Sequence, residues 1–293
     1  SVSSCTNGID DDRDGLFDCA DPGCAGITVC ASGGDGGTGG DGGVMRPDIG
    51  PVDSGPPVTC VDPIDLVFVL DVSTSMTGEA GALRSGVSSI FAAADALTTD
   101  HRFGLVVFVD DALAIGGCRN FATAAELSSE LTTWQTFCSS NRNPVSSAMN
   151  YDCPENTLDA MWEAASSCTW RPGATHILIH VTDDTFEEPP YRYSTDLFGG
   201  GGIPAVRHYY EVRDALIADE IRVGAFAMEV PEDCGAGTSA DTGRGFFTDY
   251  GALASFPAST GGRVWDLRDV RDGTLDMATA IAEMIVDEHC TVF

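Results

Sequence analysis

A carboxylate and two hydroxyls directly follow a short apolar segment of the chain. Leu66–Leu70 reads L-V-F-V-L, and Asp71, Ser73 and Ser75 come next. These three side chains occupy alternate positions and can therefore turn to the same side. Oxygen ligands without nitrogen or sulfur suit Mg²⁺, Mn²⁺ or Ca²⁺ and not zinc. The spacing predicts that Asp71, Ser73 and Ser75 bind a hard divalent cation.

A purely structural role for the same residues stays open. Ser73 and Ser75 precede a helical pattern, and serine is favoured at the N-cap of a helix. In that case Asp71 would bind backbone amides of the following loop, and no cation would be needed.

The elements that must position these residues follow from the pattern of apolar side chains. A continuous apolar run such as Leu66–Leu70 is typical of a central strand in a parallel sheet, and ligands bind at the carboxyl ends of such strands. Further strands are expected at about 103–109, 177–182, 223–230 and 263–267, and helices at about 79–98, 123–137, from Thr157, 208–221 and 275–285. The stretch 138–154 fits neither pattern. The alternation predicts an α/β fold with a doubly wound, mostly parallel sheet and helices on both faces.

The segment Asp71-Val72-Ser73-Thr74-Ser75 resembles the D-x-S-x-S motif of the von Willebrand factor type A (vWA) domain. This motif belongs to the metal-ion-dependent adhesion site that vWA domains share with integrin I domains. The resemblance extends over residues 60–293, because the expected strands and helices follow in the order of that fold. It implies two further site residues, a Thr at the start of a helix and an Asp after a strand, which Thr157 and Asp183 match.

Two departures from the family pattern lie beside these residues. Asp184 stands where the family usually has Gly, which adds a negative charge to the turn. Pro154-Glu155-Asn156 replaces the Gly-Gly that usually precedes the Thr. Thr157 is therefore the least secure member of the expected site, although Thr182 and Thr185 match its position less well.

The resemblance also implies how the site works. The hydroxyls of Ser73, Ser75 and Thr157 would bind Mg²⁺ directly, and the carboxylates of Asp71 and Asp183 would hold its water ligands. One coordination position would remain for an Asp or Glu carboxylate of a protein partner. The predicted function is a secreted or surface-displayed adhesion or receptor module. The alternative is a structural extracellular or matrix protein in which the metals only stabilise the fold. The sequence contains no H-E-x-x-H, G-x-S-x-G or phosphate-loop motif, so we expect no enzymatic activity.

A second cation site is expected in the cysteine-rich segment 1–30. Its spacing is that of a twelve-residue calcium loop, with Gly15 at the sharp turn, and the ligands would come from Asp10, Asp12, Asp14, Leu16 through its carbonyl, Asp18 and Asp21. The pattern is similar to thrombospondin type 3 repeats and to Asp/Cys repeats of bacterial surface proteins. An acidic loop closed by disulfides without Ca²⁺ is the alternative. The Gly- and Pro-rich residues 31–59 are expected to be a linker between this segment and the domain at 60–293.

Eleven cysteines indicate disulfides and an oxidising compartment. In a vWA fold both ends of the domain meet opposite the metal face, which favours a Cys60–Cys290 bond and a constitutive binder whose last helix does not slide. The other expected pairs are Cys118–Cys138, Cys153–Cys168 and two bridges among Cys5, Cys19, Cys24 and Cys30, which leaves Cys234 unpaired.

The net charge of −30 excludes nucleic acids and anionic membranes as partners, because the chain repels both. No apolar run approaches the ~20 residues of a membrane helix, so no transmembrane segment is expected in this chain. We expect an extracellular or cell-surface location, as a bacterial secreted or lipoprotein-like chain. A trimmed mature chain explains the Val2–Cys5 start more simply than the end of a lipoprotein signal does.

Overall fold

The computed structural model describes residues 62–196, 201–230, 232–233, 239–291 and 293. The chain divides into two units, Ser1–Pro57 and Val58–Phe293, and the described residues all belong to the second. The expected calcium loop, the linker, Cys60 and Cys234 lie outside the described residues and stay predictions.

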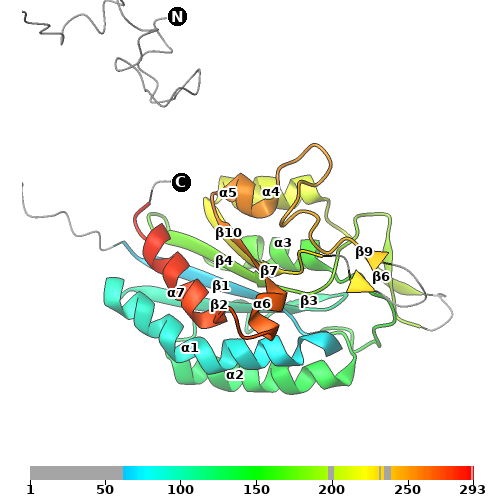
Figure 1. Cartoon of the computed structure of the whole chain (residues 1–293), viewed down its shortest axis with the longest axis horizontal. Helices are drawn as coiled ribbons and strands as arrows, with labels where there is room; N and C mark the ends of the chain where they lie inside the picture. Colours follow the sequence, from blue (N-terminus) through cyan, green and yellow to red (C-terminus); the bar gives the residue numbers. More distant parts are fainter. Residues whose placement is uncertain (1–61, 197–200, 231, 234–238, 292) are drawn as a thin grey trace, which may run out of the picture. The chain divides into compact units, whose positions relative to one another are not determined.

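A six-stranded sheet forms the centre of the domain (Figure 1). Its strands are β1 (Ile64–Asp71), β2 (His101–Phe108), β3 (Ala112–Ala114), β4 (Thr175–Val181), β7 (Ile221–Ala227) and β10 (Arg263–Asp266), in the order β10-β7-β4-β1-β2-β3. All neighbours are parallel except β2 and the short edge strand β3. The order runs outward in both directions from β1 and β4, as in doubly wound folds. The predicted mostly parallel α/β sheet is confirmed.

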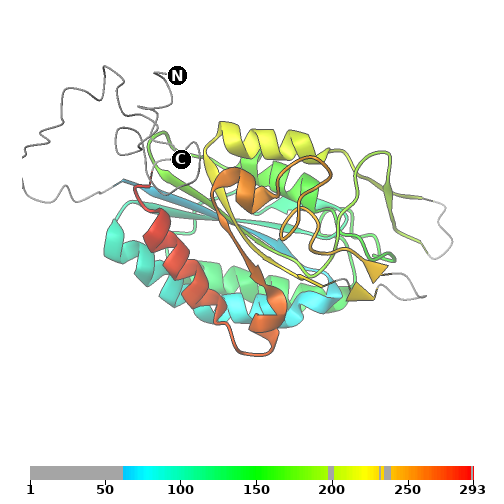
Figure 2. The same cartoon turned by 45° about the horizontal axis from the view of Figure 1, so that its top comes forward.

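Helices cover both faces of the sheet (Figures 1 and 2). One face carries α1 (Thr77–Leu97), α2 (Ala124–Phe137), α6 (Leu267–Arg271) and α7 (Met277–Glu288), and the other carries α3 (Thr157–Ser167), α4 (Tyr209–Ala218) and α5 (Phe256–Thr260). Two 3₁₀ turns, η4 (Thr74–Met76) and η5 (Cys138–Ser140), and two small antiparallel ribbons, β5 (Arg192–Ser194) with β6 (Gly202–Pro204) and β8 (Glu232–Asp233) with β9 (Ser239–Ala240), complete the described elements.

The central strand β1 divides the apolar core in two. Leu66, Phe68 and Leu70 pack with the α1, α2 and α7 side, whereas Val67 and Val69 pack with the α3 and α4 side. Alternate side chains of a strand point to opposite faces, so a strand between two helical layers must be apolar at every position. This explains the unbroken apolar run that the sequence shows.

Local sequence signals fix where the helices begin. The hydroxyl of Thr123 accepts a hydrogen bond from the Glu126 amide at the start of α2, and the Asp276 carboxylate accepts one from the Thr279 amide at the start of α7.

Gly86 sets the distance between α1 and α7, because a Cβ at this position would lie 2.3 Å from the Cβ of Ala278. The last helix is therefore packed tightly against the first.

The observed disulfides correct two predictions. Cys118 and Cys168 are bonded to each other, with 5.0 Å between their Cα atoms. The predicted pairs Cys118–Cys138 and Cys153–Cys168 are therefore wrong. Cys138 packs in the core on the α2 side of the sheet, while Cys118 and Cys168 lie on the α3 side, so the sheet separates them. Cys138 is a buried free thiol, and Cys153 and Cys290 are disulfide-bonded.

Candidate metal centre

The predicted cation ligands gather where β1 and β4 end. These two strands are parallel neighbours, with Leu70 opposite Val181. The residues that follow each strand therefore emerge side by side, at the point where the strand order reverses. In open α/β sheets this switch point is the usual ligand-binding position. The fold thus brings the D-x-S-x-S segment next to Asp183.

The Asp71 carboxylate is fully buried and anchored at both oxygens. Its Oδ1 accepts the Ser73 amide at 2.7 Å, and its Oδ2 accepts the Thr182 hydroxyl at 2.7 Å. The pKa of Asp71 is raised to about 7, because burial and, next, the charge of Asp183 raise it more than the hydrogen bonds from Ser73 and Thr182 lower it. Bringing a cation near would restore the charged form, because an opposite charge stabilises the carboxylate.

The two serine hydroxyls do not cap a helix. Ser73 makes no side-chain capping bond to η4, and α1 begins later, after Met76, again without a side-chain cap. Instead, the Oγ atoms of Ser73 and Ser75 lie 3.1 Å apart, and Ser75 donates to Asp183 Oδ1 at 2.9 Å. The capping role that the purely structural interpretation gives to the serines is therefore not observed, whereas the bond from the Ser73 amide to Asp71 is the one that interpretation expects.

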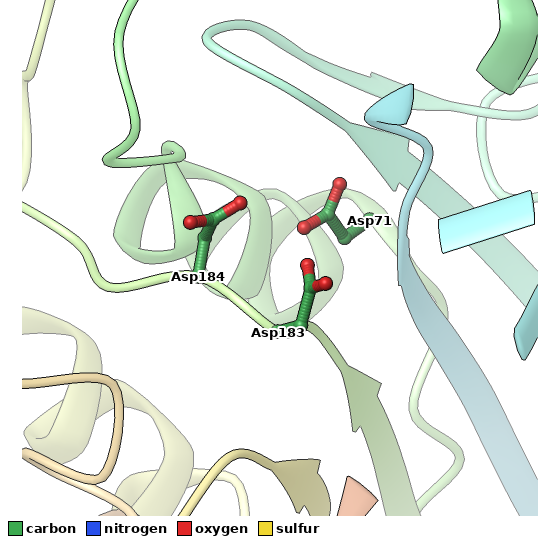
Figure 3. A group of neighbouring side chains, drawn as sticks. All are labelled: Asp71, Asp183 and Asp184. Carbon is green, nitrogen blue, oxygen red and sulfur yellow. The ribbon is translucent and has the colours of Figure 1, made fainter. Parts of the chain in front are cut away.

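Three carboxylates form a compact cluster at this position (Figure 3). Asp71, Asp183 and Asp184 each offer an oxygen atom, and these atoms lie within 4.8 Å of one another. Asp71 and Asp183 are buried, whereas Asp184 is partly exposed. Such a group could hold a metal ion, because close carboxylates repel one another unless a positive charge lies between them. Asp184, expected only as a departure from the family pattern, is thus part of the cluster.

An open cavity of about 280 Å³ lies over this cluster. It is lined by Ser73, Thr74, Ser75, Asn141, Asn150, Asp152, Cys153, Glu155, Asp183 and Asp184. All these side chains are polar except the bonded cysteine, and the described lining contains no basic residue. The cavity therefore suits a small hydrated cation better than an apolar ligand.

Thr157 does not line this cavity. It begins α3, is fully buried, and its hydroxyl lies 3.4 Å from Nε2 of His180. Glu155, two residues earlier, is the member of this loop that reaches the cavity. The structure thus brings together Asp71, Ser73, Ser75 and Asp183 of the expected set, and Glu155 lines the cavity whereas Thr157 does not.

The Glu155 carboxylate has an incomplete set of hydrogen bonds. Its Oε1 accepts from the side-chain amide of Asn150 at 2.7 Å, whereas Oε2 is buried and has no partner among the described residues. Burial raises the pKa of Glu155 well above its ordinary value, and the charges of Asp71 and Asp184 act in the same direction. A buried carboxylate oxygen without a partner is costly, and a bound cation would satisfy it. The residues present therefore fit a divalent cation.

Polar side chains behind the cavity hold in place the loop of residues 142–156, which carries Glu155 and is called the second loop below. The Asn156 side chain donates to the Asp110 carbonyl at 2.9 Å, and Asn143 donates to the Asp110 carboxylate at 2.7 Å. Tyr191 donates to Asp152 at 2.6 Å. Burial raises the pKa of Asp110 to about 7, which the bond from Asn143 opposes. These bonds fix the loop that carries Glu155 although residues 142–156 contain no helix or sheet strand.

Arg271 is the positively charged group nearest to the acidic cluster that the structure describes. It lies at the end of α6, and its Nη2 donates to Asp183 Oδ2 at 2.5 Å. Its Nε donates to the buried carboxylate of Glu79 in the first turn of α1. Burial lowers the pKa of Arg271, but the bonds to Glu79 and Asp183 outweigh it, and the net effect is a rise. The guanidinium therefore stays charged and neutralises part of the cluster.

His180 supports the site from below without facing it. Its ring stacks between Phe108 and Phe246, with centroid distances of 5.5 and 5.1 Å. Burial lowers the pKa of His180 to about 3, so the ring is neutral. His176 lies four residues earlier on β4, and its ring nitrogens are within hydrogen-bond distance of the carbonyl oxygens of Asp219 and Arg171. Neither histidine lines the cavity.

Three site residues were missed from the sequence. Asp184 and Glu155 were visible signals, because both are acids beside the expected ligands Asp183 and Thr157. Arg271 gave no signal, since its contact with Asp183 spans 88 residues. Long-range pairs of this kind follow from the fold alone.

No family model matches the chain. Among curated proteins, "Alpha-protein kinase vwkA" of Dictyostelium discoideum is 25% identical over 143 residues, which are 47% of this chain. The match spans 21% of the length of that protein. Among solved structures, an aerotolerance-related membrane protein from Bacteroides fragilis is 14% identical and is matched over 77% of this chain and 98% of its own, with a TM-score of 0.45. BatB from Bacteroides thetaiotaomicron is 14% identical, over 78% and 100%, with a TM-score of 0.44.

Within the described part of the chain, none of the helices has both the length and the apolar character needed to cross a membrane.

Proposed function

We propose that residues 60–293 form a vWA-like domain that binds a partner protein through a divalent cation. The observation that carries this proposal is the convergence of Ser73, Ser75 and Asp183 over an open cavity at the switch point of the sheet. The neutral hydroxyls and buried carboxylates there are oxygen donors, which favour Mg²⁺, with Mn²⁺ and Ca²⁺ as alternatives. A bound cation would supply an electrophilic centre that attracts a carboxylate.

Each site residue has a distinct role in this proposal. Ser73 and Ser75 supply hydroxyl ligands from the turn after β1. Asp71 and Asp183 supply negative charge, and Asp71 also fixes the turn through the Ser73 amide. Glu155 supplies the oxygen that the second loop contributes, since its Oε2 is buried without a partner among the described residues. Thr157 instead supports His180 beneath the site.

The partner would present an Asp or Glu carboxylate. A chain with a net charge of −30 repels acidic surfaces at a distance, so the cation must reverse the local field for such a ligand to bind. This requirement makes binding strictly dependent on the cation. Ser75 and the cavity face solvent, so a partner carboxylate could reach a cation bound there.

A structural role for the cation is the second candidate. It draws on the burial of Asp71, Asp183 and Glu155, whose charges a cation would neutralise. The two candidates differ in what chelation does to the protein. A binding module keeps its fold and loses its partner, whereas a structural site loses the fold itself.

We place the protein at the cell surface or outside the cell. The Cys118–Cys168 disulfide and the bonded Cys153 and Cys290 support an oxidising compartment. The Ca²⁺ loop at residues 10–21 is part of this proposal as a separate site. We also propose that the domain acts by binding and has no enzymatic activity.

The first test is titration of the full chain, freed of metals, with Mg²⁺ in a calorimeter. Binding of about one Mg²⁺ ion beyond any sites in residues 1–30 is expected, and Asp71→Asn should weaken that binding strongly while Asp14→Asn should not. The second test is capture of surface proteins in Mg²⁺, repeated with chelator and with Asp71→Asn. A partner captured equally under all three conditions would contradict the proposal, as would loss of near-ultraviolet circular dichroism on chelation.

A further inference from the structure

The short helix α6 reaches the cation site through a single side chain. This helix joins β10 to the segment that leads into α7. Arg271 is its last residue, and its guanidinium extends to Asp183, 88 residues away in the sequence. The side chain is 30% exposed, while Asp183 is buried. The ion pair between Arg271 and Asp183 thus connects α6 to the cation site.

Asp183 divides its two oxygens between the site and α6. Its Oδ1 accepts the Ser75 hydroxyl on the cavity side, and its Oδ2 accepts Nη2 of Arg271. A cation bound beside Ser75 and the Arg271 guanidinium would therefore share one carboxylate. Two positive charges that share one anion weaken each other's interaction with it.

Glu79 holds the other edge of the guanidinium. One of its oxygens accepts from Arg271 Nε, and its Oε2 is buried without a partner among the described residues. Arg271 thus bridges two buried acids from elements that lie far apart in the sequence. Its charge is matched to these two acids, and its position depends on both of them.

We propose that Arg271 is the internal counter-ion of the cation site, so that cation binding and the docking of α6 oppose each other. This inference rests on the proposed function and adds a means of regulating it. Coupling between two events at one group is reciprocal. Arg271 therefore lowers the affinity for the cation, and the bound cation loosens α6 by the same factor.

The proposal predicts a specific change in Mg²⁺ affinity. Arg271→Gln removes the competing charge, so its dissociation constant for Mg²⁺ should fall by roughly tenfold relative to the wild type. Arg271→Lys keeps the charge and should stay within about twofold of the wild type. The matched control is Arg268→Gln, on the same helix, because Arg268 is more exposed and pairs with Asp266 and Glu229 outside the cavity. This control should leave the affinity unchanged.

The reciprocal effect is measured on the wild-type chain by amide hydrogen exchange. The amides of residues 268–274 should exchange faster in saturating Mg²⁺ than in chelator, whereas those of β1 and β4 should not. This measurement needs no variant, so it tests the proposal even if Arg271→Gln does not fold.

The outcomes separate this inference from the proposed function. If the wild type binds Mg²⁺ but Arg271→Gln binds it with equal or lower affinity, Arg271 is only a structural residue and the inference falls alone. Unchanged or slower exchange of α6 in Mg²⁺ would overturn it in the same way. If the wild type binds no Mg²⁺ at the Asp71 site, both the function and the inference are overturned.

Discussion

The hydroxyl of Ser75 donates to Asp183 Oδ1 at 2.9 Å, although 108 residues separate the two in the sequence. The contact follows from the pairing of β1 with β4, whose parallel register brings their carboxyl ends level. One strand delivers the hydroxyls and the other the acid. The hydroxyl and the acid thus emerge from adjacent central strands, and we expect single substitutions in the site to change binding without disturbing the fold.

Asp71→Asn should weaken cation binding strongly and leave the fold intact. The variant keeps the size of the side chain but removes the charge, and changes around a metal site typically weaken metal binding by about 10–100-fold. Mg²⁺ at a hundred times the wild-type dissociation constant should stabilise the wild type by about 2.7 kcal/mol and the variant by only about 0.4–1.4 kcal/mol. Urea unfolding with and without Mg²⁺ measures both values.

The matched control for this experiment is Asp214→Asn. Asp214 is an exposed residue of α4 outside the cavity, paired with Arg213. It should behave as the wild type does. Equal stabilisation of Asp71→Asn and the wild type by Mg²⁺ would show that the cation binds elsewhere.

A second prediction separates Glu155 from Thr157. Glu155→Gln keeps the bond with Asn150 possible but removes the charge that faces the cavity, so the Mg²⁺ affinity should fall at least tenfold. Thr157→Val removes only the hydroxyl beside His180 and should leave the affinity within about twofold. Calorimetric titration of both variants gives the comparison directly. The reverse ranking would restore Thr157 as the ligand from this loop.

The sheet and its covering helices were predictable because each carries a strong repeating pattern. The apolar run in β1 and the spacing of Leu83, Val87 and Ile90 in α1 predicted elements that the structure confirms within a few residues. Short elements carry too few residues for a pattern. β3, α5 and α6 have between three and five residues each, and none was predicted.

The site was predictable where its residues adjoin strong elements. Asp71 ends β1, Ser73 and Ser75 follow it directly, and Asp183 lies two residues after β4. The second loop has no such anchor, because hydrogen bonds of Asn143, Asn150 and Asn156 fix its path. Periodicity could therefore not show that Glu155, and not Thr157, lines the cavity. The disulfide prediction failed for a related reason, since loop length does not reveal which face of the sheet a cysteine occupies.

The third prediction concerns His180 and pH. Burial lowers its pKa in the folded state to about 3, from an ordinary value of 6.5. Between these values the unfolded chain binds a proton that the folded chain does not, so this group makes stability fall as the pH falls below 6.5. At pH 4.5 the loss attributable to His180 is about 2–3 kcal/mol relative to pH 7.

His180→Phe tests this contribution. The substituted ring keeps the stack between Phe108 and Phe246 but cannot be protonated. Asp71 and Asp110, whose pKa values are raised, act in the opposite direction, so only the difference between the two proteins is informative. Urea unfolding at pH 7 and 4.5 should show that the variant gains about 2–3 kcal/mol on the wild type at the lower pH. Parallel stability curves would mean that His180 does not titrate as its burial implies.

The last prediction concerns the disulfide between Cys118, in the turn after β3, and Cys168, at the end of α3. Cys118 and Cys168 close a loop with a sequence separation of 50 residues. In the chain-entropy model a loop of this length stabilises the folded state by about 4 kcal/mol. The double variant Cys118→Ser, Cys168→Ser should therefore unfold at a clearly lower urea concentration. Cys138→Ala is the control, because it removes a buried thiol that forms no bond to another cysteine and should cost only about 1 kcal/mol.

Since the disulfide lies away from the cavity, the double variant should keep its Mg²⁺ affinity at low temperature. A loss of Mg²⁺ binding in a variant that is still folded would instead mean that this bond helps to position the loop carrying Glu155.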